Sequence, residues 1–427
     1  MAGTNKVLTA NQVQLSGPAH PLSGTFHLPA SKSESNRALI IRALAGGGQL
    51  DNLSAANDTQ LMQRLLAESA GNGAAPLDAE DAGTVMRFLT AYLALTGRPA
   101  VLTGTARMQE RPIGVLVDAL RELGARIEYI GQEGFPPLRL LGCAPQAGAD
   151  DGQPPTLRVR GDISSQYISA LLMLGPTLPH GLRLRLTGQV ASRPYLRLTL
   201  ALMRHFGAAA RDLGQVFDVL PQPYQPADYV VEADWSAASY AYALVALGAP
   251  GSHLTLPGLR CHSWQGDQVI AQLMLSLGVQ TEYLQNGVRL TQTKLATHLT
   301  HDFTDCPDLA QTVAVVAAAK RIPATLSGLS SLRIKETDRI AALQTELAKF
   351  GASMRETSEG IFKVDTESFA VASQAISTYH DHRMAMAFAP LALLGPLQVE
   401  APAVVRKSFP GFWDELGQVG FEVLPVG

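Results

Sequence analysis

One arrangement of hydrophobic and polar positions recurs along the chain: an amphipathic helix ends at a glycine, and a short β-type run follows. The helical segments carry apolar residues three and four positions apart, which predicts one buried face on each. A helix commonly ends with a residue in the left-handed conformation, where glycine avoids a Cβ clash. The pattern predicts six helix–glycine–strand units. Four clear copies end at Gly124, Gly207, Gly278 and Gly351, and weaker copies end near Gly71 and Gly420.

A second kind of helix precedes each of these units. It opens on polar or charged residues and continues with small apolar ones, so we expect it to be buried on all sides. Free backbone N–H groups and about half a positive charge mark each helix start, which favours an anion site where several starts meet. Ordinary N-capping by Ser and Asp is the alternative. The six openings lie at 31–37, 81–87, 161–166, 234–238, 308–312 and 380–383.

Composition narrows the class of protein. Hydrophobic residues make up 46% of the 427 positions and charged residues 17%, which excludes a disordered chain and suggests two to four domains or one large one. A formal net charge of −3 gives no global attraction to nucleic acid or an anionic membrane. The N-terminus lacks the apolar core of a signal peptide, and no run of 18 or more apolar residues occurs. We therefore expect a cytoplasmic protein without nucleic-acid or membrane partners.

Cysteine and histidine give no metal signature. Cys143, Cys261 and Cys306 are far apart and form no CxxC pair, so we expect three reduced thiols. His380 and His382 form a His-x-His pair with no third ligand evident nearby, so we predict no metal site.

The basic residues fall in places that helix formation alone does not explain. The chain has eight lysines, and Lys32 lies at a helix start, where a cation opposes the helix dipole unless an anion is bound. Arg37 follows in the same segment. Ser31 and Glu34 fit a capping box, and we expect Glu34 to face outward as part of that cap.

The segment around Lys335 shows the same conflict. Lys335 and Arg339 are four residues apart, which places like charges on one predicted helical face. Glu336 and Asp338 would relieve this as a solvated ion-pair network. The functional alternative is a cradle for a dianion, with one carboxylate kept for proton transfer.

Nine segments across residues 31–410 occur in an order that resembles the 5-enolpyruvylshikimate-3-phosphate synthase (3-phosphoshikimate 1-carboxyvinyltransferase) family: SKSESNR, DAGTVMRF, RMQERPIG, GDISSQY, SRPY, CPDLAQT, RIKETDR, DHRMAM and RKSFP. The resemblance implies an α/β fold, a two-domain inverted barrel of six β/α units, three per domain, with the active site in the interdomain cleft. It places the first domain at 1–30 plus 235–427 and the second at 31–234.

The resemblance also implies the reaction. The enolpyruvyl group of phosphoenolpyruvate is transferred to the 5-hydroxyl of shikimate 3-phosphate with release of phosphate, in the pathway to aromatic amino acids. Separately from the resemblance, we expect no cofactor and no metal, and a monomer. Each substrate carries a carboxylate and a phosphate, which explains the need for Arg forks and Lys charges.

Site residues follow from the matching positions in these segments. Asp308 would act as base toward the hydroxyl, Glu336 as acid at the methylene carbon, and Lys32 would assist the departing phosphate. Phosphoenolpyruvate would be held by Lys32, Gly83, Arg111, Gln166, Arg339, Arg383 and Lys407. Shikimate 3-phosphate would be held by Lys32, Ser33, Arg37, Ser164, Ser165, Gln166, Ser192, Asp308 and Lys335, with Tyr195 a neighbour.

Two alternatives remain. A related enolpyruvyl transferase acts on UDP-N-acetylglucosamine and uses a loop cysteine, for which Cys143 is the candidate by position. The other is a non-catalytic anion-binding protein of the same fold. Asp81 and His380 stand where we would expect Asn, and Ser331 where an Asn often touches shikimate 3-phosphate. Their contribution is left open.

Overall fold

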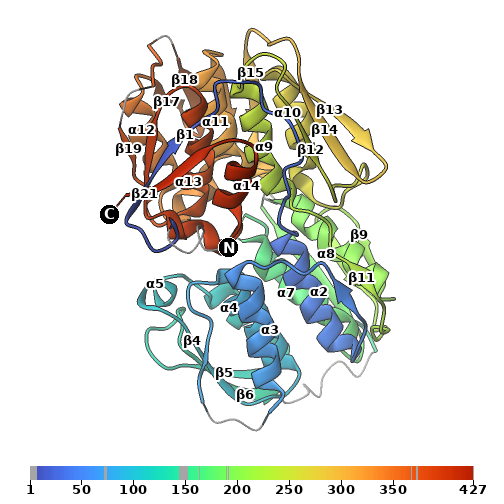
Figure 1. Ribbon diagram of the computed structural model, residues 1–427. Helices are drawn as coiled ribbons and strands as arrows, with labels where there is room; N and C mark the ends of the chain where they lie inside the picture. The colour runs from blue at the N-terminus through green and yellow to red at the C-terminus, as the bar shows by residue number, and fades with distance from the viewer. Residues whose placement is uncertain are drawn as a thin grey trace. The chain divides into compact units, whose positions relative to one another are not determined.

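The computed structural model describes residues 7–71, 75–143, 152–162, 164–188, 190, 192–366, 368–371 and 374–426. The chain forms two compact units (Figure 1). Unit 1 comprises Met1–Ser31 and Glu232–Gly427, and unit 2 comprises Lys32–Val231. Unit 2 is therefore one continuous stretch, whereas unit 1 is built from both ends of the chain.

Three sheets belong to unit 1. The first has the strand order β19 (Ala375–Ile376), β20 (Leu397–Glu400), β1 (Gln12–Ser16), β21 (Glu422–Val426). The second has the order β15 (Leu299–Asp302), β16 (Ala324–Ser327), β18 (Ile361–Asp365), β17 (Ser353–Ser358). The third has the order β12 (His253–Leu256), β14 (Gly287–Gln292), β13 (Val279–Leu284).

Three sheets also belong to unit 2. The first has the order β3 (Leu77–Asp78), β4 (Ala100–Thr103), β6 (Leu138–Cys143), β5 (Ala125–Tyr129). The second has the order β7 (Thr156–Arg160), β8 (Leu182–Thr187), β10 (Val216–Val219), β9 (Ala210–Asp212). The third is reduced to the parallel pair β2 (Leu50–Asp51) and β11 (Tyr229–Val230).

The four-stranded sheets share one pairing scheme. In each, the first two strands are parallel and the remaining neighbours are antiparallel. The β12–β14–β13 sheet approaches this scheme through a parallel bridge from Thr25 to Thr255. The repetition predicted from the sequence is therefore a repetition of supersecondary structure.

The helix–glycine–strand pattern is confirmed at five of its six positions. Each of the five helices is followed by a glycine in the left-handed region and then by the edge strand β5, β9, β13, β17 or β21. Gly71 differs, because it follows a helix (α3, Asn57–Ser69) without adopting positive φ. The five helices are α6 (Gly114–Glu122), α8 (Arg193–His205), α10 (Ile270–Ser276), α12 (Arg339–Lys349) and α14 (Phe412–Gln418).

The apolar helices form the interior of each unit. In unit 1, α9 (Trp235–Leu247), α11 (Ala310–Ala319) and α13 (His382–Phe388) pack against one another and are buried along nearly their whole length. In unit 2, α4 (Gly83–Leu95) packs against α2 (Lys32–Ala45) and α7 (Ser165–Leu174). The predicted burial is confirmed, except that α2 is only partly buried from Arg42 to its C-terminus.

Shorter elements connect these layers. The helix α5 (Ala106–Gln109) follows β4, and the 3-10 helices are η1 (Gly175–Thr177), η2 (Gly266–Val269), η3 (Phe303–Asp305), η4 (Pro307–Leu309), η5 (Ser330–Ile334), η6 (Ala389–Leu393) and η7 (Pro402–Lys407).

Two local predictions are wrong. Glu34 does not face outward: it is 1% exposed and accepts a hydrogen bond from the hydroxyl of Tyr229. Lys335 and Arg339 do not share a helical face, because α12 begins only at Arg339. The carboxylate of Asp338 caps that helix by accepting from the backbone N–H groups of Ile340 and Ala341.

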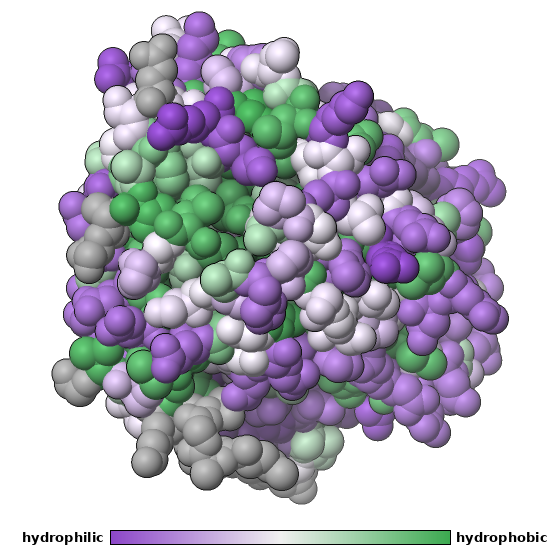
Figure 2. Space-filling model, turned by 45° about the horizontal axis from the view of Figure 1, so that its top comes forward, coloured by the Kyte–Doolittle hydropathy of each residue, from purple (hydrophilic) through white to green (hydrophobic). Residues whose placement is uncertain are grey.

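The surface mixes both kinds of residue. On the face shown in Figure 2, hydrophilic residues dominate the right and lower parts, hydrophobic residues form one contiguous area in the upper left, and others are scattered singly. Singly exposed hydrophobic residues are normal on folded proteins. Within the part of the chain that the structure describes, none of the helices has the length and apolarity needed to cross a bilayer.

Candidate functional site

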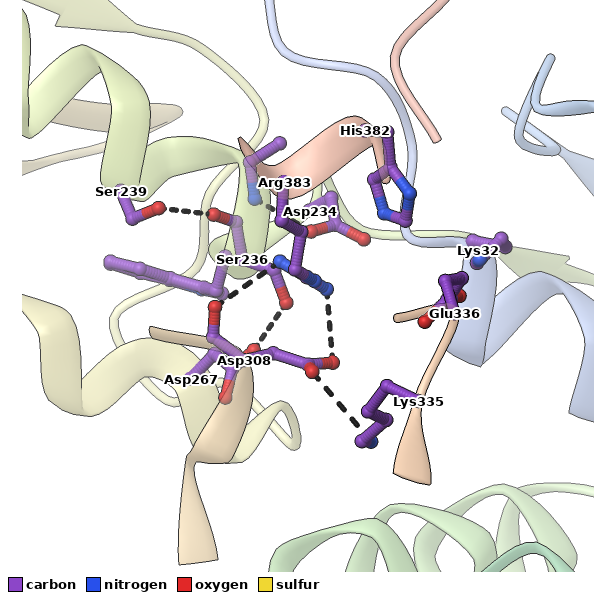
Figure 3. A network of polar contacts seen from close by, with 12 residues as sticks. Lys32, Asp234, Ser236, Ser239, Asp267, Asp308, Lys335, Glu336, His382 and Arg383 are labelled. Atoms are coloured by element: carbon purple, nitrogen blue, oxygen red, sulfur yellow. Dashed lines mark hydrogen bonds and ion pairs between the residues drawn. The ribbon is translucent and has the colours of Figure 1, made fainter. Parts of the chain in front are cut away.

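The starts of two buried helices in unit 1 meet at Asp308. Asp308 lies in η4, immediately before α11, and Arg383 lies in the first turn of α13. Because α11 and α13 pack side by side, their openings emerge together, as the pattern predicts. Figure 3 shows Arg383 pointing toward the carboxylate of Asp308, with Lys335 approaching the same carboxylate.

Asp308 is surrounded by three cations. Its Oδ2 lies 2.9 Å from Nη2 of Arg383, and its Oδ1 lies 3.0 Å from Nη1 of Arg339 and 3.8 Å from Nζ of Lys335. Burial alone would raise the pKa of this carboxyl, but the charges of Arg383, Lys335 and Arg339 outweigh burial and hold the pKa well below its usual range. Asp308 is therefore firmly ionised in the ligand-free protein.

Arg339 links Asp308 to two further carboxylates. Its side chain is buried, and it donates from Nε to Asp381 at 2.7 Å and from Nη2 to Glu336 at 3.0 Å. Burial lowers the pKa of Arg339, but Asp381, Glu336 and Asp308 together raise it above its ordinary value. Asp381 was missed as a site residue. It is fully buried and also caps α13 by accepting from the N–H of Arg383.

Lys407 completes the cluster. It lies at the end of η7, with its Nζ 3.4 Å from Oε1 of Glu336. Unit 1 thus brings together the six residues predicted for it from the sequence, which are Asp308, Lys335, Glu336, Arg339, Arg383 and Lys407. The arrangement holds cations in fixed positions around two carboxylates that are each only partly buried.

Two protonatable groups beneath this cluster were also missed. The hydroxyl of Tyr240 lies 3.4 Å from Nη1 of Arg383, and burial raises the pKa of Tyr240 to about 12. Asp267 is 3% exposed and accepts a hydrogen bond from Ser236. Burial, followed by the charge of Asp308, raises the pKa of Asp267 to about 7. No feature of the sequence around Asp267 marks it.

In unit 2, Lys32 forms an ion pair with Asp58. The Nζ of Lys32 lies 3.0 Å from Oδ2 of Asp58, and both side chains are largely buried. Asp58, in the first turn of α3, was not recognised from the sequence. Lys32 opens α2, so the pairing offsets a cation that the helix dipole disfavours.

Arg37 is held deeper in unit 2. Its Nε donates to Thr199 at 2.8 Å, its Nη1 to the carbonyl oxygen of Ser33 at 2.8 Å, and its Nη2 to Ser169 at 3.1 Å. The guanidinium also lies 5.8 Å from the ring centre of Tyr195. Burial lowers the pKa of Arg37 to about 10. Tyr195, predicted as a neighbour of shikimate 3-phosphate, thus lies beside one of the residues predicted to bind that substrate.

The openings of α4 and α7 also meet. The Nε2 of Gln166 donates to the hydroxyl of Thr84 at 3.0 Å, and the guanidinium of Arg111 lies against Gly83, the first residue of α4. The hydroxyl of Ser164 caps α7, which continues with Ser165, by accepting from the N–H of Gln166 at 3.3 Å.

The remaining positions have individual settings. Ser192 opens α8 with φ 55°, a left-handed conformation that costs a non-glycine residue energy and often marks a functional position. Asp81 accepts a hydrogen bond from Thr105, and His380 has φ 57°. Ser331 lies in η5. Burial raises the pKa of the Cys143 thiol, which disfavours the thiolate that the cysteine-dependent alternative needs.

The described residues could bind a metal ion only where several suitable side chains lie together. Among those residues, no group of three or more His, Cys, Asp or Glu side chains is placed to hold a metal ion.

Comparison with known proteins gives one consistent result. Residues 67–416 match the family EPSP synthase (3-phosphoshikimate 1-carboxyvinyltransferase). A 3-phosphoshikimate 1-carboxyvinyltransferase of Bacteroides fragilis is 50% identical over 414 residues, covering 96% of this chain and 98% of the relative. One of Vibrio cholerae is 38% identical over 430 residues, covering 94% and 98%. The solved structure of an EPSP synthase from Acinetobacter baumannii has a TM-score of 0.78 at 21% identity, covering 96% of this chain and 99% of that one. The last comparison confirms the predicted two-domain α/β fold.

Proposed function

The chain belongs to the EPSP synthase family, and we infer that it is a 3-phosphoshikimate 1-carboxyvinyltransferase of the shikimate pathway. It transfers the enolpyruvyl group of phosphoenolpyruvate to the 5-hydroxyl of shikimate 3-phosphate and releases phosphate. The observation that carries this inference is the unit 1 cluster, in which Lys335, Arg339, Arg383 and Lys407 surround two carboxylates. Such a set is suited to substrates that each bring a carboxylate and a phosphate.

Substrate binding is assigned by position. We propose that phosphoenolpyruvate is bound by Lys32, Gly83, Arg111, Gln166, Arg339, Arg383 and Lys407. Shikimate 3-phosphate is bound by Lys32, Ser33, Arg37, Ser164, Ser165, Gln166, Ser192, Asp308 and Lys335. Support comes from the two sets of contacts described above, one in each unit, and from the excess of basic over acidic residues among these positions.

Asp308 is proposed as the base for the 5-hydroxyl. A carboxylate whose pKa is far below its usual range is a weak base, because it holds a proton poorly. Substrate anions compete for Arg383, Arg339 and Lys335, and this competition weakens their hold on Asp308. The pKa of Asp308 therefore rises when the substrates bind, at the stage when a base is needed.

Glu336 and Lys32 take the other two roles. Glu336 delivers a proton to the methylene carbon of phosphoenolpyruvate and removes one again when phosphate leaves. Its contacts with Arg339 and Lys407 fix its position. Lys32 supplies charge and a proton to the departing phosphate.

Phosphate release tests the proposal directly. Phosphate should appear when phosphoenolpyruvate and shikimate 3-phosphate are both present, and not with either alone. Release with UDP-N-acetylglucosamine in place of shikimate 3-phosphate would favour the related transferase. Binding of both substrates without release would favour a non-catalytic anion-binding protein.

We also propose a cytoplasmic monomer. The three cysteines are all free thiols, which fits a reducing compartment. Cell fractionation tests the location, and sedimentation equilibrium tests the oligomeric state.

A further inference from the structure

Arg87 in α4 carries a buried guanidinium that the sequence reasoning did not use. The residue is 6% exposed, and its Nε and Nη1 are buried without a hydrogen-bond partner. Its guanidinium lies 5.4 Å from the ring centre of Tyr167. Among the described residues, no acidic side chain forms an ion pair with Arg87. Isolated buried cations are destabilising, so a fold that keeps one calls for an explanation.

The helix geometry explains where this guanidinium lies. Side chains on a helix point back toward its N-terminus, so Arg87 reaches over Gly83, one turn earlier and the first residue of α4. A Cβ placed on Gly83 would lie 2.2 Å from Nη1 of Arg87 and 2.8 Å from Nη2 of Arg111. Two guanidinium groups therefore fill the space that a side chain at position 83 would occupy.

Positive charge accumulates at this helix start. The free N–H groups of the first turn of α4 add about half a charge to the two guanidinium groups. The nearest acid along the chain is Asp81, whose carboxylate accepts from Thr105 and whose carbonyl oxygen lies 3.4 Å from Nη1 of Arg111. A dianion bound at this helix start would neutralise the excess.

We propose that Arg87 is a positioning residue for phosphoenolpyruvate. Its guanidinium fixes Gly83 and Arg111 in the arrangement that accepts the anion, and its positive charge adds to the attraction for that anion. This rests on the proposed function, in which Gly83 and Arg111 bind phosphoenolpyruvate. It also gives position 83 a second reason to be glycine, because Arg87 takes up the side-chain space.

Steady-state kinetics of Arg87→Met test the proposal. The KM for phosphoenolpyruvate should rise at least about tenfold, the factor expected when one charge-assisted interaction is lost, while the KM for shikimate 3-phosphate changes less than about twofold. Arg87→Lys, which keeps the charge without the planar fork, should give an intermediate KM. Arg98→Met, the same change three residues beyond the end of α4, is the matched control and should behave as wild type. An unchanged KM for phosphoenolpyruvate, or equal rises in both KM values, would overturn the proposal.

Thermal unfolding separates positioning from a purely structural role. Removing an isolated buried cation should leave the Tm of Arg87→Met equal to or above that of wild type. A lowered Tm combined with normal kinetics would show that Arg87 is structural. If Arg87→Met does not fold, Arg87→Lys carries the test, and a wild-type KM for phosphoenolpyruvate in that variant would overturn the proposal.

A binding measurement keeps the two proposals distinguishable. The rise in Tm caused by phosphoenolpyruvate alone should be smaller in Arg87→Met than in wild type. If wild type shows this rise but no phosphate release with both substrates, the proposed function fails and the anion site stands. If neither protein responds to phosphoenolpyruvate and the KM for phosphoenolpyruvate of Arg87→Met equals that of wild type, the role of Arg87 is refuted.

Discussion

At the scale of single residues, the charge on Asp308 is controlled by its neighbours. Arg339 and Arg383 donate to different oxygens of its carboxylate, so the group is held in both position and ionisation. The same contacts mean that removing the side chain would disturb both arginines. An isosteric amide is therefore a cleaner probe of the base than alanine.

Asp308→Asn should lower kcat by about 10²- to 10⁴-fold, because the amide cannot accept the hydroxyl proton. The dissociation constants of both substrates should change much less than kcat, since the amide oxygen can still accept from one arginine. Stopped-flow kinetics and calorimetric titration measure the two quantities. A kcat within a few-fold of wild type would exclude Asp308 as the base.

The pH dependence of stability should reveal the lowered pKa of Asp308. An aspartate in the unfolded chain has a pKa of about 3.9, above the folded-state pKa of Asp308. The stabilisation is therefore complete above about pH 5 and is lost as pH falls below about 4, where only the unfolded chain takes up the proton. Wild type should exceed Asp308→Asn in free energy of unfolding at pH 7, and the gap should narrow toward pH 3. Urea unfolding at these pH values measures it, and a constant gap would contradict the assignment.

Arg339 depends on the shape of its side chain as well as its charge. Its Nε, Nη1 and Nη2 each donate to a different carboxylate, which a lysine cannot reproduce. Arg339→Lys should lower the free energy of unfolding by about 3 kcal/mol, as expected for breaking a buried pair. Arg333→Lys, at an exposed arginine paired with Asp338 and Glu356, should cost less than about 1 kcal/mol. Chemical unfolding of both variants tests this, and equal losses would be evidence against it.

At the scale of elements, the glycine that ends each helix has a measurable role. Gly351 follows α12, whereas Gly360 lies in the turn between β17 and β18 and serves as the comparison. Both have positive φ, 74° and 70°. A Cβ on Gly351 would lie 2.5 Å from the carbonyl oxygen of Ser368, whereas one on Gly360 would meet nothing within 4 Å. Gly360→Ala should cost about 1–2 kcal/mol from backbone strain alone, and Gly351→Ala should cost more. Equilibrium unfolding compares the two, and equal losses would mean that the contact with Ser368 relaxes freely.

The sequence predictions succeeded mostly where the interactions are between residues close together in the sequence, and failed mostly where they are between distant residues. The helix–glycine–strand pattern depends on residues within a few positions of one another, and five of its six glycines behave as predicted. Glu34 was misplaced because its partner, Tyr229, lies 195 residues away. The helical face at Lys335 was wrong because a single side chain, Asp338, fixes the start of α12.

The candidate site shows the same limit. Some residues predicted from the matching segments lie together in the structure, such as Asp308 and Arg383. Asp58 and Asp267 were missed because each contacts a residue distant in sequence. Asp58 forms an ion pair with Lys32, and Asp267 accepts a hydrogen bond from Ser236. Asp381 lay inside a recognised segment, and its burial beside Arg339 gives it a role that spacing alone does not reveal.

At the scale of the whole molecule, the boundaries of unit 2 make it separable. In unit 1, the N–H of Ser31 donates to the carbonyl oxygen of Glu232 at 2.8 Å, and Ala30 forms a bridge with Ala233. The two chain ends left after removal of residues 32–231 are therefore already adjacent.

A protein in which two glycines replace residues 32–231 should fold as unit 1, and residues 32–231 expressed alone should fold as unit 2. Circular dichroism and urea unfolding should show a cooperative transition for each. Neither should release phosphate, because the proposed binding residues Gly83 and Arg111 belong to unit 2 and Asp308 to unit 1. A non-cooperative transition in both would show that the units depend on each other for folding.

The strand β1 has a consequence for biosynthesis. It lies between β20 and β21, so residues 12–15 pair with residues 397–400, and residues 12–16 pair with residues 422–426. Figure 1 shows β1 beside β21. A ribosome releases the first of these segments long before the other two, whereas unit 2 has all its strands once residue 231 has emerged. During translation the middle of the polypeptide can therefore reach its final form first, while the amino-terminal strand waits, unpaired, for the last residues to be synthesised.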